Sequence, residues 1–404
     1  MSDTGSSFLE GFKVVYGDNG DAFKKQQNLL AKTWAKIPVS PLKPSKKGTS
    51  LPVEMSGNEI GGAMNPGESF GVPGAMNPQS AVVLPKEYHW PFAVEGSLIA
   101  LSEGGDKVAF GSAVENIMQS VAKRFTSDVN RGALGKGTGQ LSLANGAGTA
   151  ATALIVDNAI PFRRGMVLDS FVSIGGAKEI GAVTPATITA VDYTTNTLTI
   201  TPAQTWSDNS IIVKNKVQDG APVGGKEVTG LQAICDTTAY STTFESLVVA
   251  SNPEWVGNVI DASGAPISHD LLRKSLARGR TIGGASPTNL ISNEGQARNF
   301  ENTELQKTRY EPTKIDAGVT TLRWNELEWM IEKDYDLNEV GMYDMENVFK
   351  IQTKDIHLNK LKGSDFYQIS GKDAISGYYS YYGNMGTWKR NAHIRLTNLA
   401  EPTF

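Results

Sequence analysis

Cysteine is nearly absent from this chain, which has a single one, Cys235, among 404 residues. An intrachain disulfide is therefore excluded, and a lone thiol fits a reducing interior. The nearest histidine is His269, too distant in sequence to suggest an activating base, so we interpret Cys235 as a small buried residue and not as a nucleophile. Long apolar runs are also missing, and residues 1–20 lack the pattern of a signal peptide. These absences predict a soluble protein made in the cytoplasm.

Histidine is scarce as well, and the spacing of the few that exist fits no metal site. We interpret all of them as surface or capping residues: His89, His269, His357 and His393. The run Asp334-Tyr-Asp336-Leu-Asn338 begins like a calcium loop. However, Glu339 stands where such a loop needs glycine, and Met345 stands where it needs a bidentate glutamate. No metal is predicted.

The common catalytic and nucleotide-binding motifs are missing too. The run from Arg131 to Gly139 is rich in glycine and contains Lys136, but Gly137 follows that lysine where a phosphate loop needs serine or threonine. The run also follows a predicted helix instead of opening one. No nucleophile elbow, zinc-protease helix or dinucleotide fingerprint is present, so we predict no cofactor and no enzymatic activity.

Basic charge is not gathered into any block. The net charge is −4, and the 38 lysines and arginines are scattered along the chain. This distribution argues against tight binding of nucleic acid through a basic tail, and it predicts at most a weak, nonspecific contact.

Glycine and proline, in contrast, are abundant, and they concentrate between Pro38 and Leu101. The pentapeptide Gly-Ala-Met-Asn-Pro occurs there twice, at 62–66 and at 74–78. Repeated Asn-Pro turns predict a two-stranded excursion whose arms fold back on each other, although a disordered linker remains the simpler alternative. Because so long a loop buries little in its own subunit, we expect it to pack on a neighbouring one.

The rest of the chain gives periodic patterns. Apolar residues predict helices over 21–37 and over 106–133, the second with a polar face that includes Lys123 and Arg124. Residues 150–217 read as an all-β module, a small barrel or a sandwich. From Val228 onward helices and strands alternate, with Ser268 and Ser292 as expected helix caps. The chain ends in a predicted hairpin that turns at 383–386.

The loop and the long helix supply the candidate contacts with a neighbouring copy. These are Met64, Phe70, Met76, Tyr88, Trp90, Lys123, Arg124 and Arg131.

The order of these parts resembles the major capsid proteins of tailed bacteriophages, the Caudoviricetes, which have the Hong Kong ninety-seven type fold. The most suggestive local segments are Pro287-Thr-Asn-Leu-Ile-Ser-Asn-Glu-Gly-Gln-Ala-Arg298 and Tyr381-Tyr-Gly-Asn-Met-Gly-Thr-Trp-Lys-Arg-Asn-Ala-His-Ile-Arg395. The resemblance implies an α+β fold with an inserted all-β domain. Its expected divisions are an N-terminal arm (1–45), an extended loop (46–104), the spine helix of a peripheral domain (105–149), the insertion (150–217), an axial domain with part of the peripheral domain (218–350) and C-terminal strands (351–404).

The resemblance also implies a function. Copies would assemble as hexamers and pentamers into an icosahedral shell around double-stranded DNA, in the host cytoplasm and then in the virion. The implied partners are a portal and a separately encoded scaffolding protein, and the resemblance also allows for a decoration protein. No membrane is implied. Because 54–85 contain no lysine, a covalent crosslink at the loop tip is not expected.

Two other functions fit parts of the sequence. An encapsulin, a nanocompartment shell, shares this fold. A β-rich carbohydrate-binding or hydrolytic protein would instead use Trp206, Trp255 and Trp324 as sugar platforms and Glu326 with Asp334 as an acid pair. We interpret these tryptophans as core residues.

Overall fold

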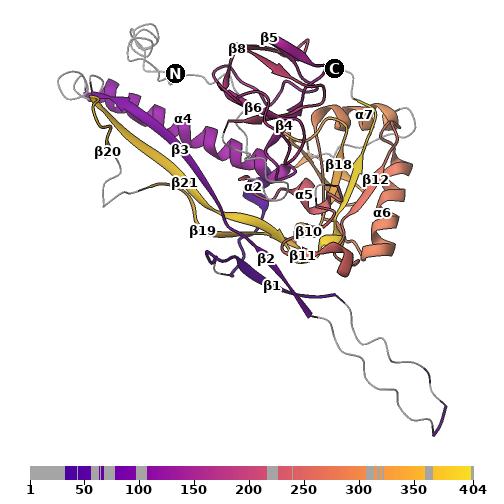
Figure 1. Ribbon diagram of the computed structural model, residues 1–404. Helices are drawn as coiled ribbons and strands as arrows, with labels where there is room; N and C mark the ends of the chain where they lie inside the picture. The colour runs from indigo at the N-terminus through magenta and orange to yellow at the C-terminus, as the bar shows by residue number, and fades with distance from the viewer. Residues whose placement is uncertain are drawn as a thin grey trace.

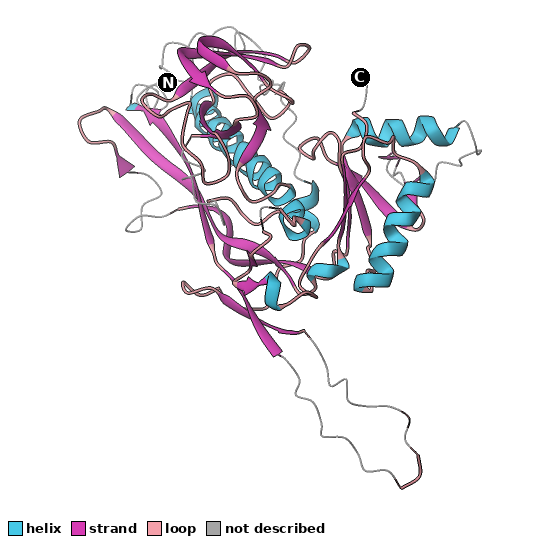
Figure 2. Cartoon of the chain, turned by 45° about the vertical axis from the view of Figure 1, so that its right-hand side comes forward, coloured by secondary structure: helices cyan, strands magenta, loops and turns pink. Residues whose placement is uncertain are grey.

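The computed structural model describes residues 32–42, 44–55, 63, 65–67, 78–96, 107–215, 226–238, 240–305, 314–315, 319–320, 323–359 and 367–401. It is a mixed α and β structure with several sheets and few helices (Figures 1 and 2). Within these residues no helix combines the length and the apolar character needed to cross a membrane.

The long predicted helix is present as α4, Lys107–Leu134, and it lies along a ribbon of long strands (Figure 1). The ribbon consists of β3 (Lys86–Glu95), β19 (Val348–Leu358), β20 (Tyr367–Gln368) and β21 (Ala374–Thr387). Strand β21 pairs antiparallel with β3, β19 and β20. Phe125 and Val129 are fully buried between the helix and its neighbours, as the apolar periodicity predicts.

The predicted terminal hairpin is wrong. Residues 383–386 do not turn: they continue β21 and pair with residues 349–352 of β19. Glycine is needed at 383 because of a close approach, since a Cβ atom there would lie 2.5 Å from the Ile351 carbonyl oxygen. The expected second arm, β22 (Ile394–Thr397), belongs to a different sheet.

The predicted all-β region forms one antiparallel six-stranded sheet, in the order β4-β9-β6-β7-β8-β5, with its own apolar core. Its strands are β4 (Gln140–Leu143), β5 (Gly148–Ile155), β6 (Val167–Phe171), β7 (Ala186–Asp192), β8 (Thr197–Trp206) and β9 (Ile211–Lys214). The sheet therefore begins at Gln140 and not at 150. Its first strand was missed because it is only four residues long and half of them are polar.

The C-terminal half is built on a second six-stranded sheet, in the order β12-β22-β18-β13-β17-β16. Its strands besides β22 are β12 (Asn258–Asp261), β13 (Asn289–Ser292), β16 (Arg323–Trp324), β17 (Leu327–Ile331) and β18 (Val340–Tyr343). Helices α6 (His269–Gly283) and α7 (Glu294–Leu305) flank it (Figures 1 and 2).

The remaining elements are short. They are α2 (Lys32–Lys36), β1 (Thr49–Glu54), β2 (Pro78–Val83), α5 (Leu231–Cys235), β10 (Thr243–Phe244), β11 (Leu247–Val248), η1 (Val249–Ser251), β14 (Lys314–Ile315), β15 (Val319–Thr320) and η2 (Arg390–Ala392).

One of the two predicted helix caps is correct. The Ser268 side chain accepts a hydrogen bond from the Leu271 amide and caps α6. For α7 the capping residue is Asn293 and not Ser292, because the Asn293 side chain accepts from the Gln296 amide. The Ser292 hydroxyl is occupied instead by the Trp329 indole, which donates to it at 2.7 Å.

Candidate assembly surfaces

A two-stranded stem extends from the body of the chain where the excursion was predicted (Figure 1). Strand β1 pairs antiparallel with β2, from Thr49 opposite Val83 to Glu54 opposite Pro78. Leu51, Ala81 and Val83 fix the stem in the main core. The predicted contact residues Met64, Phe70 and Met76 lie outside the described residues, so their role stays a prediction.

The base of the stem rests on the β10–β11 turn. The Val82 amide donates a 2.7 Å hydrogen bond to the Glu245 carbonyl. Both carboxylate oxygens of Glu245 are buried there without a hydrogen-bond partner. Burial raises the pKa of this carboxyl group to about 8, and the Thr387 backbone and the Arg390 guanidinium oppose that rise only in part.

Tyr88 and Trp90, the two described aromatic residues predicted at the interface, have partners within their own chain. The Val228 amide donates to the Tyr88 hydroxyl at 2.8 Å, and the Tyr88 ring packs on Phe125. Burial, followed by the nearby Glu227, raises the pKa of Tyr88. Trp90 also packs on Phe125, and the Lys214 ammonium lies 3.7 Å from the centre of its ring. Any contact of these rings with another copy is limited to their exposed remainder.

Arg131 is held within the chain as well. It forms an ion pair with Glu227 and a second one, at 3.3 Å, with Asp128, which also faces Lys214 at 3.4 Å. Burial alone would raise the pKa of Asp128, but Lys214 and Arg131 hold it below its usual value. This network joins the end of α4 to the last strand of the 140–214 sheet.

The network lines part of a basic groove of about 610 Å³ between α4 and that sheet. Its charged lining residues are Arg124, Asp128, Arg131, Arg163, Arg164, Lys214, Lys333 and Asp334. Arg124 and Arg164 are exposed and have no ion pair with any described residue. Lys123 is exposed beside Arg124. Of the predicted contact residues that the structure describes, Lys123 and Arg124 are the ones left free for a partner.

The sugar-binding surface of the alternative interpretation is not formed by its three tryptophans. Trp206, Trp255 and Trp324 are all buried, in agreement with their interpretation as core residues. Asp334 is paired with Lys333 at 3.0 Å. A stacking platform needs an exposed ring, so these residues cannot bind a sugar in this fold.

The two aspartates of the run that begins like a calcium loop have partners in the chain: Asp334 pairs with Lys333. Asp336 pairs with Lys136 at 3.0 Å, which joins the calcium-like run to the glycine-rich run. The described part of the chain contains no cluster of three or more potential metal ligands. Cys235 is fully buried, and burial raises its thiol pKa to about 12.

The interpretation of His393 as a surface or capping residue is wrong. It is fully buried, and burial lowers its pKa to about 3. Its Nδ1 accepts from the Asp344 amide at 3.2 Å, and its Nε2 lies 3.0 Å from the Thr387 hydroxyl. The neutral ring thus joins β21 to the C-terminal sheet.

Sequence patterns missed Arg390, a buried cation with three hydrogen bonds. Arg390 is 1% exposed and donates to three backbone carbonyls, those of Ile234, Trp255 and Asp236, at 2.8–3.0 Å. Burial lowers its pKa to about 10. No local signal marks such a residue, because its acceptors lie more than a hundred positions away.

Comparison with solved structures assigns the fold of this chain. No protein-family model matches the sequence, and no curated protein is significantly similar to it. Among solved structures, the cyanophage A-1(L) capsid asymmetric unit matches with a TM-score of 0.56 at 10% identity, covering 95% of this chain and 97% of that one. The capsid of an empty GTA particle matches with a TM-score of 0.49 at 10% identity, covering 99% and 100%.

The holo-SrpI encapsulin complex from Synechococcus elongatus PCC 7942 matches with a TM-score of 0.46 at 10% identity, covering 96% and 95%. The fold assignment rests on the cyanophage match, which spans nearly the whole of both chains. The expectation from the order of parts is thereby confirmed at the level of the fold: this chain has the Hong Kong ninety-seven type fold of tailed-phage capsid proteins.

Proposed function

We propose that this chain is the major capsid protein of a tailed double-stranded DNA bacteriophage. In this role it assembles with copies of itself, as hexamers and pentamers, into the icosahedral shell of the virion, and it acts as a structural protein without enzymatic activity. The observation that carries the proposal is the likeness to the cyanophage capsid subunit over almost the full length of both chains.

The structural divisions of the family are assigned as part of this proposal. The β1–β2 stem is the base of the extended loop, α4 is the spine helix, and the ribbon of β3, β19 and β21 completes the peripheral domain. The 140–214 sheet is an inserted domain, supported by its separate core. The sheet from β12 to β16 with its helices is the axial domain.

The extended loop is proposed to contact the basic groove of a neighbouring copy. Residues 54–85 contain three glutamates, Glu54, Glu59 and Glu68, and no other charged side chain. The groove contains the free guanidinium groups of Arg124 and Arg164. Opposite charges on surfaces that meet in every copy select the register of assembly more than they add affinity.

Charge reversal tests this contact. Arg124→Glu with Arg164→Glu should reduce shell yield at least about tenfold, because like charges then face each other. Adding Glu59→Lys and Glu68→Lys should restore the yield, as measured by sedimentation. Arg273→Glu, a charge reversal at an exposed residue of α6 outside the groove, is the matched control. Normal assembly of the double arginine variant would refute the contact.

The shell itself is tested by electron microscopy of the purified chain, with and without a scaffolding protein. Closed icosahedral particles or capsomer rings are expected, whereas a monomer under all conditions would refute the proposal. The portal, the scaffolding protein, a decoration protein and weak contact with packaged DNA belong to the same proposal. Particles that enclose a cargo enzyme in place of DNA would favour the encapsulin alternative.

A further inference from the structure

Strand β12 forms an open edge of the C-terminal sheet. It stands at one end of the sheet order, and among the described strands it pairs only with β22, in parallel. The Asn258 amide donates to the His393 carbonyl at 3.3 Å, and the Ala262 amide donates to the Thr397 carbonyl at 2.8 Å. Because a strand directs alternate residues to opposite sides, the backbone groups of Val259 and Asp261 face outward. No described residue pairs with this outer edge.

The usual protections of an exposed edge are missing from β12. Its sequence, Asn258–Asp261, has no proline and no lysine, and only the final residue is charged. Neither is it bulged, since its four residues pair with β22 in continuous register. Such an edge is suited to receive a further strand from another segment.

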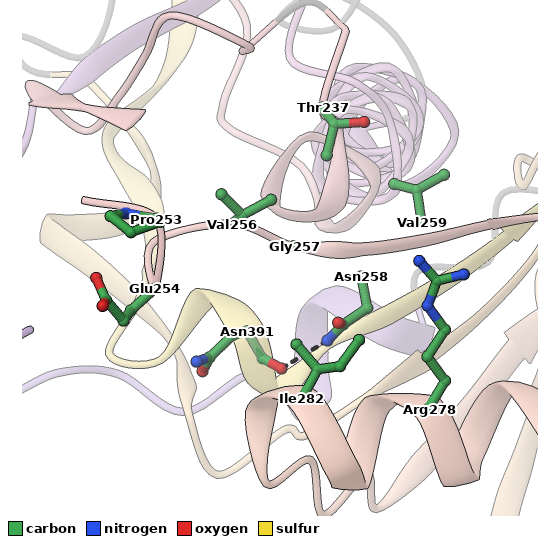
Figure 3. A pocket seen from close by; sticks show the side chains of 10 residues that line it. All are labelled: Thr237, Pro253, Glu254, Val256, Gly257, Asn258, Val259, Arg278, Ile282 and Asn391. Carbon is green, nitrogen blue, oxygen red and sulfur yellow. Dashed lines mark hydrogen bonds between the residues drawn. The ribbon is translucent and has the colours of Figure 1, made fainter. Parts of the chain in front are cut away.

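A groove of about 520 Å³ lies at the start of this edge, where Asn258 and Val259 of β12 line it (Figure 3). Arg278 and Ile282 rise from α6 on one side, and they lie one helical turn apart. Pro253 and Val256 line the other part of the groove. Ile282 is 63% exposed, so it presents an apolar side chain to whatever occupies the groove.

The groove also carries one charge of each sign. Glu254 lies toward one end and Arg278 toward the other (Figure 3). Both side chains are exposed, and neither has an ionic partner among the described residues. The groove therefore suits a short extended segment that has apolar side chains and carries a cation and an anion in matching order.

One segment of the chain outside the described residues has these properties. Residues 12–16 read Phe-Lys-Val-Val-Tyr between Gly11 and Gly17, a run of β-branched and aromatic residues bounded by turn formers. Lys13 precedes Asp18 in the sequence. In a strand parallel to β12, this order places the lysine near Glu254 and the aspartate near Arg278. Two other segments outside the described residues fit the groove less well. Residues 56–77 are interrupted throughout by glycine and proline, and residues 97–106 are tethered at both ends, by β3 and α4.

We propose that residues 12–16 of a neighbouring copy add to the outer edge of β12 as a parallel strand, with Lys13 near Glu254 and Asp18 near Arg278. Five residues of strand span about 16 Å, which is comparable to β12. Residues 17–31 extend up to about 50 Å, enough to reach an adjacent subunit from α2. The inference rests on the proposed function only in taking the donor to be another copy.

Crosslinking between two cysteine variants tests the proposal. In a Cys235→Ala background, one chain carries Val14→Cys and a differently tagged chain carries Asp261→Cys, and the two are co-expressed and treated with a short bismaleimide. A crosslinked heterodimer is expected in assembled particles. The control replaces the acceptor with Val183→Cys, which is 94% exposed in the 140–214 region and should give no specific product.

The outcomes separate the claims. A crosslink found only when both cysteines are in one chain would show that the subunit's own arm fills the groove, which overturns the assignment to a neighbour. Particles without either crosslink would overturn strand addition and leave the capsid function standing. If the parent forms no particles, the capsid proposal fails, and the groove is still tested with a labelled peptide of residues 8–20.

Peptide binding gives the second measurement. Fluorescence anisotropy should detect binding of that peptide to a chain lacking residues 1–20. A peptide with Val14→Pro, and the protein variant Ile282→Asp, should each weaken binding about tenfold or more, because proline cannot pair in a ladder and a buried unpaired carboxylate is unfavourable. Equal binding of the proline peptide would refute a strand.

Discussion

Ionisation of Glu245 should make the stability of this chain depend on pH above neutrality. Its carboxyl group lies beneath the β1–β2 stem and against β21, where a Cβ atom at Gly386 would lie 3.2 Å from its Oε1. The folded-state pKa of about 8 lies above the ordinary value of 4.5. The folded chain therefore holds this proton more tightly than the unfolded chain does.

The direction of this pH dependence follows from the linkage between protonation and folding. Stability from the neutral carboxyl group is fully present below about pH 4.5, falls as the unfolded chain ionises, and is lost as pH rises through about 8. A difference of about 3.5 pH units corresponds to at most about 5 kcal/mol. Glu245→Gln keeps the shape and removes the charge, so it should match the parent near pH 4.5 and exceed its stability by up to about 4 kcal/mol at pH 8.

Urea unfolding of both proteins at several pH values measures this difference. Glu346→Gln, at an exposed glutamate, is the matched control and should leave the pH dependence of the parent unchanged. If the parent and Glu245→Gln lose stability in parallel between pH 5 and pH 9, the carboxyl group is not buried as described and the reasoning fails.

Three further predictions concern the core. Gly383→Ala should destabilise the chain by about 2 kcal/mol or more, because the added Cβ atom would lie 2.5 Å from the Ile351 carbonyl oxygen. Gly135→Ala is the control and should have little effect, because its Cβ atom would lie 3.5 Å from the nearest atom. Thermal melting compares the two variants. Arg390→Met should cost about 3 to 5 kcal/mol by urea unfolding, because three buried carbonyls lose their donor, whereas the exposed Arg273→Met should be neutral. Cys235 should react with a maleimide only after unfolding, since the folded thiol is buried and its pKa is about 12; rapid labelling of the native chain would contradict this.

The sequence predicted those elements whose signal is local. Helix α4 was expected over 106–133 and found at Lys107–Leu134, since its apolar period is long and uninterrupted. The cap of α6 at Ser268 was also correct, because a capping side chain bonds within its own first turn. The alternation that buries one side of β3 is likewise visible in sequence.

Predictions failed where distant segments decide the structure. Gly383-Asn-Met-Gly386 has the composition of a turn, yet pairing on both sides keeps it extended. The surroundings of Glu245 and His393 are assembled from strands far apart in the chain, so their burial has no sequence signal. For the same reason Tyr88 and Arg131 could be chosen as candidate contacts but not recognised as residues with partners in their own chain.

The position of β22 has a consequence for biosynthesis. Of the described strands it comes last in sequence, yet it lies second in the C-terminal sheet, between β12 and β18. Until the ribosome has synthesised the chain past Thr397, β12 lacks the strand with which it pairs. A nascent chain therefore lacks a complete subunit surface. In the capsid role proposed above, a chain not yet synthesised past Thr397 would offer its neighbours an incomplete surface, which would disfavour assembly during synthesis.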